Sequence, residues 1–224
     1  MTSSLVVFDL DGTLIHTAHD LVASLNHTIG LRGLDPVTYD DLTHLVGHGA
    51  RAMIERAFQL RGHPLDEAGL APMMQRFLTY YGDTMPGESR PYPGLDAALD
   101  RLADAGFMLA VCTNKPEAMA RRLLQGLGMT DRFAAITGGD TFTVRKPDAA
   151  HLTGTVERAG GDLAATLMVG DSLNDCLVAR NAGVPVLGVP FGYSDAPIEA
   201  LNPDRIIQHF DELTPELVET LLKR

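Results

Sequence analysis

Three apolar runs of this sequence end directly in acidic or polar residues. They are followed by residues 9–13 (DLDGT), 113–116 (TNKP) and 170–175 (GDSLND). A further cation, Lys146, lies in the loop VRKP at 144–147. No apolar run needs a carboxylate at its end for stability, and carboxylates that converge repel one another. We therefore expect the four carboxylates of these motifs to meet around a bound cation; they are Asp9, Asp11, Asp171 and Asp175. Carboxylates are hard oxygen ligands, which suit Mg²⁺.

The spacing of the first motif suits two carboxylates with different tasks. Side chains two positions apart in an extended strand point to the same side, so Asp9 and Asp11 can face one substrate while Leu10 faces away. Such a pair can supply a nucleophile and a separate acid or base.

Each motif also has an ordinary structural explanation. DLDGT could be a turn with Gly12 at positive φ, and GDSLND could cap a helix whose dipole favours acidic residues. Thr113 and Asn114 could cap the helix that begins near Pro116, and a single lysine is usually a surface residue. The occurrence of all four in this order, each at a strand end or in the loop beyond it, favours a functional site.

The surrounding pattern predicts an open α/β sheet with parallel strands. Short continuous apolar runs indicate buried strands over 5–8, 107–111, 134–136, 167–169 and 186–189. Helical patterns separate or follow them at 95–105, 117–127, 149–159, 174–181 and 215–223. Ligands of such sheets bind beyond the carboxyl ends of the strands, where the motifs lie.

One segment breaks the alternation of strand and helix. Residues 15–89 contain helical patterns at 20–29, 50–60 and 71–81 and no convincing strand, and Pro/Gly-rich stretches close the segment. It could simply extend the core, but its place after the first strand favours a lid over the site. We therefore predict a catalytic core of residues 1–14 and 90–224 and a helical cap domain of residues 15–89.

Together these motifs resemble those of the haloacid dehalogenase superfamily, whose phosphatases carry Asp-x-Asp-Gly-Thr, then Ser or Thr, then Lys, then Gly-Asp-x-x-x-Asp. The resemblance covers essentially the whole chain. It implies an open Rossmann-like parallel sheet core with an inserted all-helical cap domain, and a Mg²⁺-dependent phosphatase. Haloacid dehalogenases proper lack the second aspartate, so Asp11 favours phosphoryl over carbon–halogen chemistry.

The resemblance also implies a role for each motif residue. Asp9 would attack phosphorus and form an aspartyl-phosphate, while Asp11 would protonate the leaving oxygen and later activate water. Mg²⁺ would be held by the Asp9 carboxylate, the Asp11 backbone carbonyl and Asp171, with Asp175 behind them. The phosphoryl oxygens would be held by Thr113, the Asn114 backbone N–H and Lys146.

The cap segment resembles that of the phosphoglycolate phosphatase and β-phosphoglucomutase branch. Segments 45–50 (LVGHGA), 191–193 (FGY) and 202–204 (NPD) are similar to phosphoglycolate phosphatases. This favours 2-phosphoglycolate as substrate, with His48 or Arg51 meeting its carboxylate. Three alternatives stay open: a phosphatase for a sugar phosphate or pyrophosphate, a phosphomutase, and a catalytically silent binding module.

Two features of the histidines bear on this interpretation. His16 stands where this branch commonly has aspartate; it could touch substrate or simply occupy the hinge between core and cap. His44 and His48 have a spacing that could bind metal, but no third ligand accompanies them.

The composition argues against some classes of binding partner. The formal net charge of -11 argues against nucleic acid and against an anionic membrane surface. Cys112 and Cys176 form no CxxC pair, and no apolar stretch is long enough for a signal peptide or a membrane span, which favours a cytoplasmic protein. The expected partner is a small phosphate ester, and the chain could be a monomer or a homodimer.

Overall fold

The computed structural model describes residues 4–41, 49–194 and 196–223. Within these residues a six-stranded sheet has the order β5-β4-β1-β6-β7-β8, with every pair of neighbours parallel. Its strands are β1 (Leu5–Phe8), β4 (Met108–Cys112), β5 (Ala135–Thr137), β6 (Thr166–Gly170), β7 (Val186–Gly188) and β8 (Arg205–Ile206). The strand order reverses around β1, which places a crevice beyond the carboxyl ends of β1 and its neighbours.

Helices cover both faces of this sheet. α4 (Leu95–Asp104), α5 (Glu117–Gly126) and α8 (Pro215–Leu222) share a hydrophobic cluster with Val6 and Phe8 of β1. α6 (Ala149–Ala159) and α7 (Leu173–Ala182) pack with Leu5 and Val7 on the other face. Because alternate side chains of β1 are buried on opposite faces, the strand reads as a continuous apolar run.

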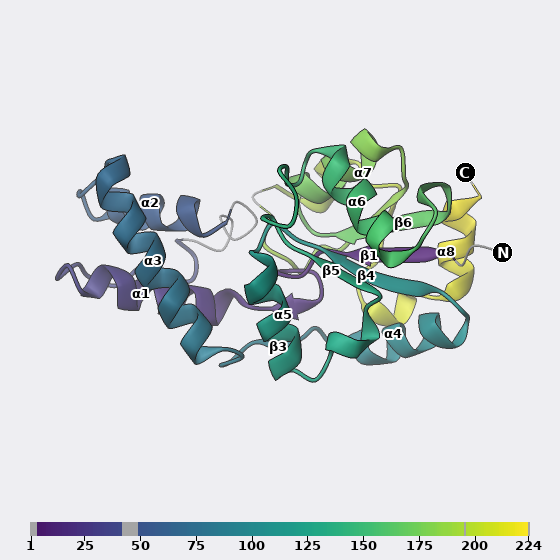
Figure 1. Cartoon of the computed structure of the whole chain (residues 1–224), viewed down its shortest axis with the longest axis horizontal. Coiled ribbons are helices and arrows are strands. Elements are labelled where there is room, and N and C mark those ends of the chain that lie inside the picture. Colours follow the sequence, from purple (N-terminus) through teal and green to yellow (C-terminus); the bar gives the residue numbers. More distant parts are fainter. Residues whose placement is uncertain (1–3, 42–48, 195, 224) are drawn as a thin grey trace.

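Three helices, at the left of Figure 1, form a second lobe. This lobe has its own hydrophobic cluster. The helices are α1 (Ala18–Gly30), α2 (Ala50–Leu60) and α3 (Glu67–Thr84). α3 begins four residues earlier than the pattern predicts, because the Asp66 side chain caps it by accepting a hydrogen bond from Gly69 N, and it continues through Pro72.

The lobe joins the sheet through two chain segments that pair with each other. β2 (Ile15–His16) and β3 (Arg90–Pro91) are antiparallel. The expectation of no strand within 15–89 is therefore wrong at Ile15–His16, since a strand of two residues leaves no alternation to detect. This pair lies at the predicted boundaries of the cap domain, and the division itself stays a prediction.

The predicted fold class is confirmed. The five predicted core strands and five core helices are all present, and every end agrees with its prediction to within one residue. β8 was not predicted, because its two residues form no apolar run. Among the residues described here, no helix is both long and apolar enough to cross a bilayer.

Candidate active site

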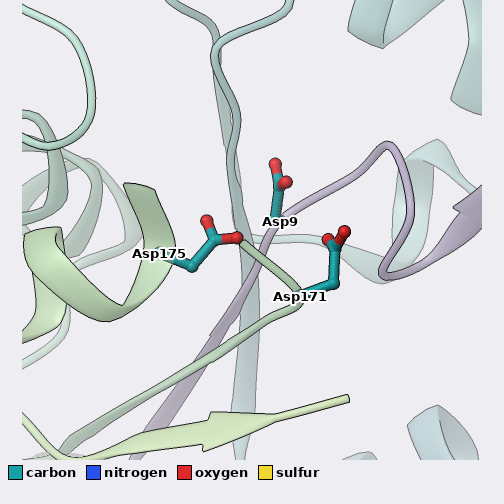
Figure 2. Close-up of side chains that lie close together, drawn as sticks. All are labelled: Asp9, Asp171 and Asp175. Carbon is teal, nitrogen blue, oxygen red and sulfur yellow. The ribbon is translucent and has the colours of Figure 1, made fainter. Parts of the chain in front are cut away.

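Three buried carboxylates gather where β1 and β6 end. Asp9 follows β1, Asp171 follows β6 and Asp175 lies in the first turn of α7; one oxygen from each lies within 4.8 Å of the others. Figure 2 shows the three side chains around one small space. The register of the two parallel strands, which pairs Phe8 with Val169, brings Asp9 and Asp171 to the same edge.

The backbone around Asp171 and Asp175 fixes both carboxylates. Asp175 accepts hydrogen bonds from the Ser172 N–H (3.0 Å) and hydroxyl (2.7 Å), so the start of α7 forms a capping box. Asp171 accepts from the Thr13 hydroxyl (2.7 Å) and from Tyr193 N (2.8 Å). These donors come from three different loops, which explains how the cluster keeps its geometry.

Gly12 makes the close approach to Asp171 possible. Its φ is +87°, and a Cβ at this position would lie 2.6 Å from Asp171 Oδ2. Both the left-handed backbone and the lack of space therefore require glycine in the first motif.

Lys146 is the cation of this cluster. Its Nζ lies 2.8 Å from Asp9 Oδ1 and 2.7 Å from Asp175 Oδ1, and the residue is only 3% exposed. Burial works against the ammonium charge, but Asp175 and Asp9 outweigh it and raise the pKa of Lys146 above its ordinary value. Its backbone N–H donates to His151 Nδ1 (3.0 Å), which fixes the loop that carries the lysine.

The cluster has the properties of a site for a divalent cation. Burial, partly offset by Lys146, raises the pKa of Asp9 to about 6. Burial and then the charges of Asp175 and Asp9 raise that of Asp171 to about 8. Asp9 Oδ1 is buried and accepts no hydrogen bond of good geometry, although Lys146 lies within ion-pair distance. Three carboxylates against one lysine leave an excess of buried negative charge, and an oxygen-only donor set fits a hard cation such as Mg²⁺.

The Asp11 side chain lies outside this cluster and contacts a second buried lysine. Lys115 Nζ donates to Asp11 Oδ1 (2.9 Å) and Oδ2 (3.1 Å), and the Thr17 hydroxyl donates to Oδ1 (2.7 Å). The same ammonium lies 2.9 Å from the Tyr81 hydroxyl and 4.5 Å from the centre of its ring. A residue of the helical lobe is therefore linked to Asp11 of the first motif through one lysine.

One pocket between the sheet edge and the helical lobe collects the predicted catalytic residues. Its lining includes all five: Asp9, Asp11, Thr113, Asn114 and Lys146. Thr113 Oγ1 accepts from Lys115 N (3.2 Å), and Asn114 Nδ2 donates to the Lys146 carbonyl (3.1 Å), so the two loops are tied together. The roles expected of these five residues stay predictions.

The helical lobe contributes a mostly apolar wall. The side chains that line the pocket from this lobe include Leu21, Met53, Phe77, Leu78 and Tyr81. The backbone of Gly49, at φ +89°, also lines it. The sequence pattern gave no role to Lys115, Tyr81 or Thr17. Lys115 had a signal, since it directly follows Thr113 and Asn114, whereas nothing local marks Tyr81.

The structure does not place Arg51 at the pocket. Its side chain is 56% exposed and donates to Glu55 (2.9 Å) and Glu67 (2.7 Å), and it is not part of the pocket lining. Salt-bridge partners on the outer surface of the lobe hold the guanidinium away from the pocket. His48, the other side chain expected to meet a substrate carboxylate, lies outside the described residues, as does His44.

His16 occupies the junction between the two lobes. It lies in β2, and its Nε2 is 3.3 Å from the Tyr39 hydroxyl, with the rings of Tyr92 and Tyr193 at its edges. It does not belong to the lining of the pocket. The hinge interpretation therefore agrees with its position better than contact with substrate.

The fold and the site define an α/β enzyme that acts on anionic groups, with an acidic cluster and two buried lysines at the carboxyl edge of a parallel sheet. The model of the haloacid dehalogenase-like hydrolase family matches residues 6–189. The chain belongs to this family, as its motifs predict.

Three known proteins show which members of the family this chain resembles. A phosphoglycolate phosphatase of Agrobacterium fabrum is 61% identical over 222 residues, which cover 99% of this chain and 95% of the relative. One of Mesorhizobium japonicum is 49% identical and covers 100% of this chain and 98% of its own. A crystal structure named as a predicted phosphoglycolate phosphatase from Haemophilus somnus superposes with a TM-score of 0.88 at 31% identity, covering 95% of this chain and 97% of its own.

Proposed function

We propose that this chain is a Mg²⁺-dependent phosphatase that hydrolyses 2-phosphoglycolate through an aspartyl-phosphate on Asp9. The observation that carries the proposal is the buried cluster of Asp9, Asp171 and Asp175 with Lys146, of which Asp9 and Lys146 line a pocket that also contains Asp11. The names of the two relatives above support the substrate.

The first half-reaction transfers the phosphoryl group to the enzyme. A carboxylate oxygen of Asp9 forms a bond to phosphorus as the bond to the leaving oxygen breaks. Asp11, in proton-bearing form, gives its proton to that oxygen, so glycolate leaves as the alcohol. In the second half-reaction Asp11 takes a proton from water as the water attacks phosphorus, which releases phosphate and restores the Asp9 carboxylate.

Charge neutralisation makes this attack possible, since a carboxylate and a phosphate dianion repel each other. Mg²⁺ would be held by the Asp9 carboxylate, the Asp11 backbone carbonyl and Asp171, and would draw negative charge from the phosphoryl oxygens. Asp175, whose two oxygens already accept from Lys146 and Ser172, would lie behind the ion. Lys146, Thr113 and the Asn114 N–H would hold the phosphoryl oxygens.

The apolar wall of the pocket supports a small leaving group. Hydroxyls of a hexose would lose water there without gaining partners, which costs free energy for each unpaired polar group. Both cysteines are buried and free, in keeping with an enzyme that works in the reducing cytoplasm.

A substrate panel tests the proposal. Phosphate release from 2-phosphoglycolate should exceed that from hexose phosphates and pyrophosphate under one set of conditions with Mg²⁺. If kcat/KM for a hexose phosphate or for pyrophosphate exceeds that for 2-phosphoglycolate by about tenfold or more, the substrate assignment is wrong. The phosphatase mechanism would still stand. No turnover of p-nitrophenyl phosphate with Mg²⁺ would overturn the enzyme assignment itself.

A further inference from the structure

Lys115 is a buried cation in the pocket that the chemistry above does not use. Its side chain is 5% exposed, and its ammonium contacts Asp11 and Tyr81. Among the described residues that line the pocket, the lysines are Lys115 and Lys146, and no arginine lines it. Lys146 is already placed between Asp9 and Asp175, so an anion elsewhere in the substrate has to find another partner.

Lys115 lies close to where the end of the substrate opposite phosphorus would be bound. The proton that Asp11 delivers goes to the leaving oxygen, so this oxygen must contact the Asp11 carboxyl group. In 2-phosphoglycolate a single methylene separates that oxygen from the carboxylate. Because Lys115 Nζ lies 2.9 Å from Asp11 Oδ1, a group one carbon beyond the leaving oxygen comes within reach of the ammonium.

We propose that Lys115 binds the carboxylate of the leaving group and that Tyr81 holds its ammonium in place; the inference rests on the proposed phosphatase function. An ammonium has three donors. Two of the contacts of Lys115 go to the two oxygens of one carboxylate, Asp11, and the third goes to the Tyr81 hydroxyl. One of the two contacts to Asp11 is therefore exchanged for a substrate oxygen without loss of the other.

The remaining wall leaves no other described cation for this task. A buried carboxylate without a partner is strongly disfavoured, and the side chains from the helical lobe that line the pocket around Tyr81 are apolar. Tyr81 comes from α3, so the specificity contact would join the helical lobe to the sheet edge through one ammonium.

The test compares 2-phosphoglycolate with ethyl phosphate, a leaving group of similar size without the carboxylate. Both alkoxides need the proton of Asp11, so any effect of Lys115 on Asp11 cancels in the ratio of the two kcat/KM values. In Lys115→Met, which keeps length and removes charge, the preference for 2-phosphoglycolate should fall by about ten- to a hundred-fold, the value of one charge-assisted hydrogen bond. Tyr81→Phe should raise KM for 2-phosphoglycolate more than for ethyl phosphate.

Arg51→Met is the matched control, because Arg51 is a cation of the helical lobe that lies outside the pocket. It should leave the ratio unchanged. Lys115→Gln, which keeps a donor toward Asp11, decides the question if circular dichroism shows that Lys115→Met is misfolded. If the variant that folds loses kcat/KM equally on both substrates, the inference is wrong. Lys115 would then act only through its contact with Asp11.

The outcomes for the inference and for the substrate assignment are separable. If a hexose phosphate proves the best substrate while the carboxylate preference over ethyl phosphate exists and depends on Lys115, the inference stands and the substrate assignment falls. If wild type hydrolyses ethyl phosphate as well as 2-phosphoglycolate, the inference falls while the phosphatase mechanism stands.

Discussion

Replacing Lys146 by methionine removes the one cation that the described structure places among three buried carboxylates. The ammonium lies within 2.8 Å of Asp9 and Asp175, and both partners are almost wholly buried. Breaking a buried ion pair on one side costs about 3–5 kcal/mol, because the remaining charge is left without a partner. In chelator we therefore expect the melting temperature to fall by about 6–20 °C for a domain of this size.

The same substitution should act on catalysis. Loss of one preorganised charge at a developing phosphoryl transition state lowers kcat by about a hundred- to a thousand-fold, and KM should rise because the lysine also attracts the bound substrate. Mg²⁺ should return part of the lost stability, since a cation would then face the carboxylates that Lys146 has left.

Thermal melts with and without Mg²⁺, together with steady-state kinetics, measure both effects. Lys223→Met is the control, because Lys223 is 77% exposed beside Glu219; its free energy of unfolding should change by less than about 0.5 kcal/mol. Melts of Lys146→Met within about 2 °C of wild type in chelator, with unchanged kinetics, would refute the reasoning.

Three further results are expected. Activity should vanish in excess chelator, and Ca²⁺ should replace Mg²⁺ poorly because its looser coordination misplaces the Asp9 oxygens; full activity without metal contradicts this. Asp11→Asn should lose about a hundred- to ten-thousand-fold on an alkyl phosphate and less on p-nitrophenyl phosphate, whose leaving group scarcely needs a proton; equal losses contradict a role as acid. In chelator, denaturant titrations should show the free energy of unfolding falling by about 1 kcal/mol from about pH 7 to about pH 8.5. The reason is that Asp171, with a pKa raised to about 8, keeps its proton in the folded state after the unfolded chain has lost it. If the free energy of unfolding falls as steeply with pH in saturating Mg²⁺, no cation binds at this carboxylate.

The sheet and the acidic cluster could be predicted because each depends on a short local pattern. Strands buried on both faces read as unbroken apolar runs, and in a parallel sheet their ends must meet at one edge. That rule predicts Asp9 and Asp171 at the same edge, and the pairing of β1 with β6 makes them neighbours there.

The contacts of the helical lobe could not be predicted in the same way. Tyr81 meets Lys115 only because of how α3 is oriented over the sheet, and no local pattern encodes that orientation. The position of the Arg51 side chain could not be predicted for the same reason, because it pairs with Glu55 and Glu67 of its own lobe. Strands as short as β2 and β8 leave no periodicity to detect.

Trapping the covalent intermediate tests the central claim most directly. Rapid acid quench of the enzyme with 2-phosphoglycolate carrying a radiolabelled phosphoryl group should yield protein-bound label that maps to the peptide containing Asp9 and is released by hydroxylamine. The Asp9→Asn variant should carry no label and release no phosphate, since an amide cannot serve as this nucleophile. Label on another residue, or phosphate release by Asp9→Asn within about tenfold of the wild-type rate, would contradict the account.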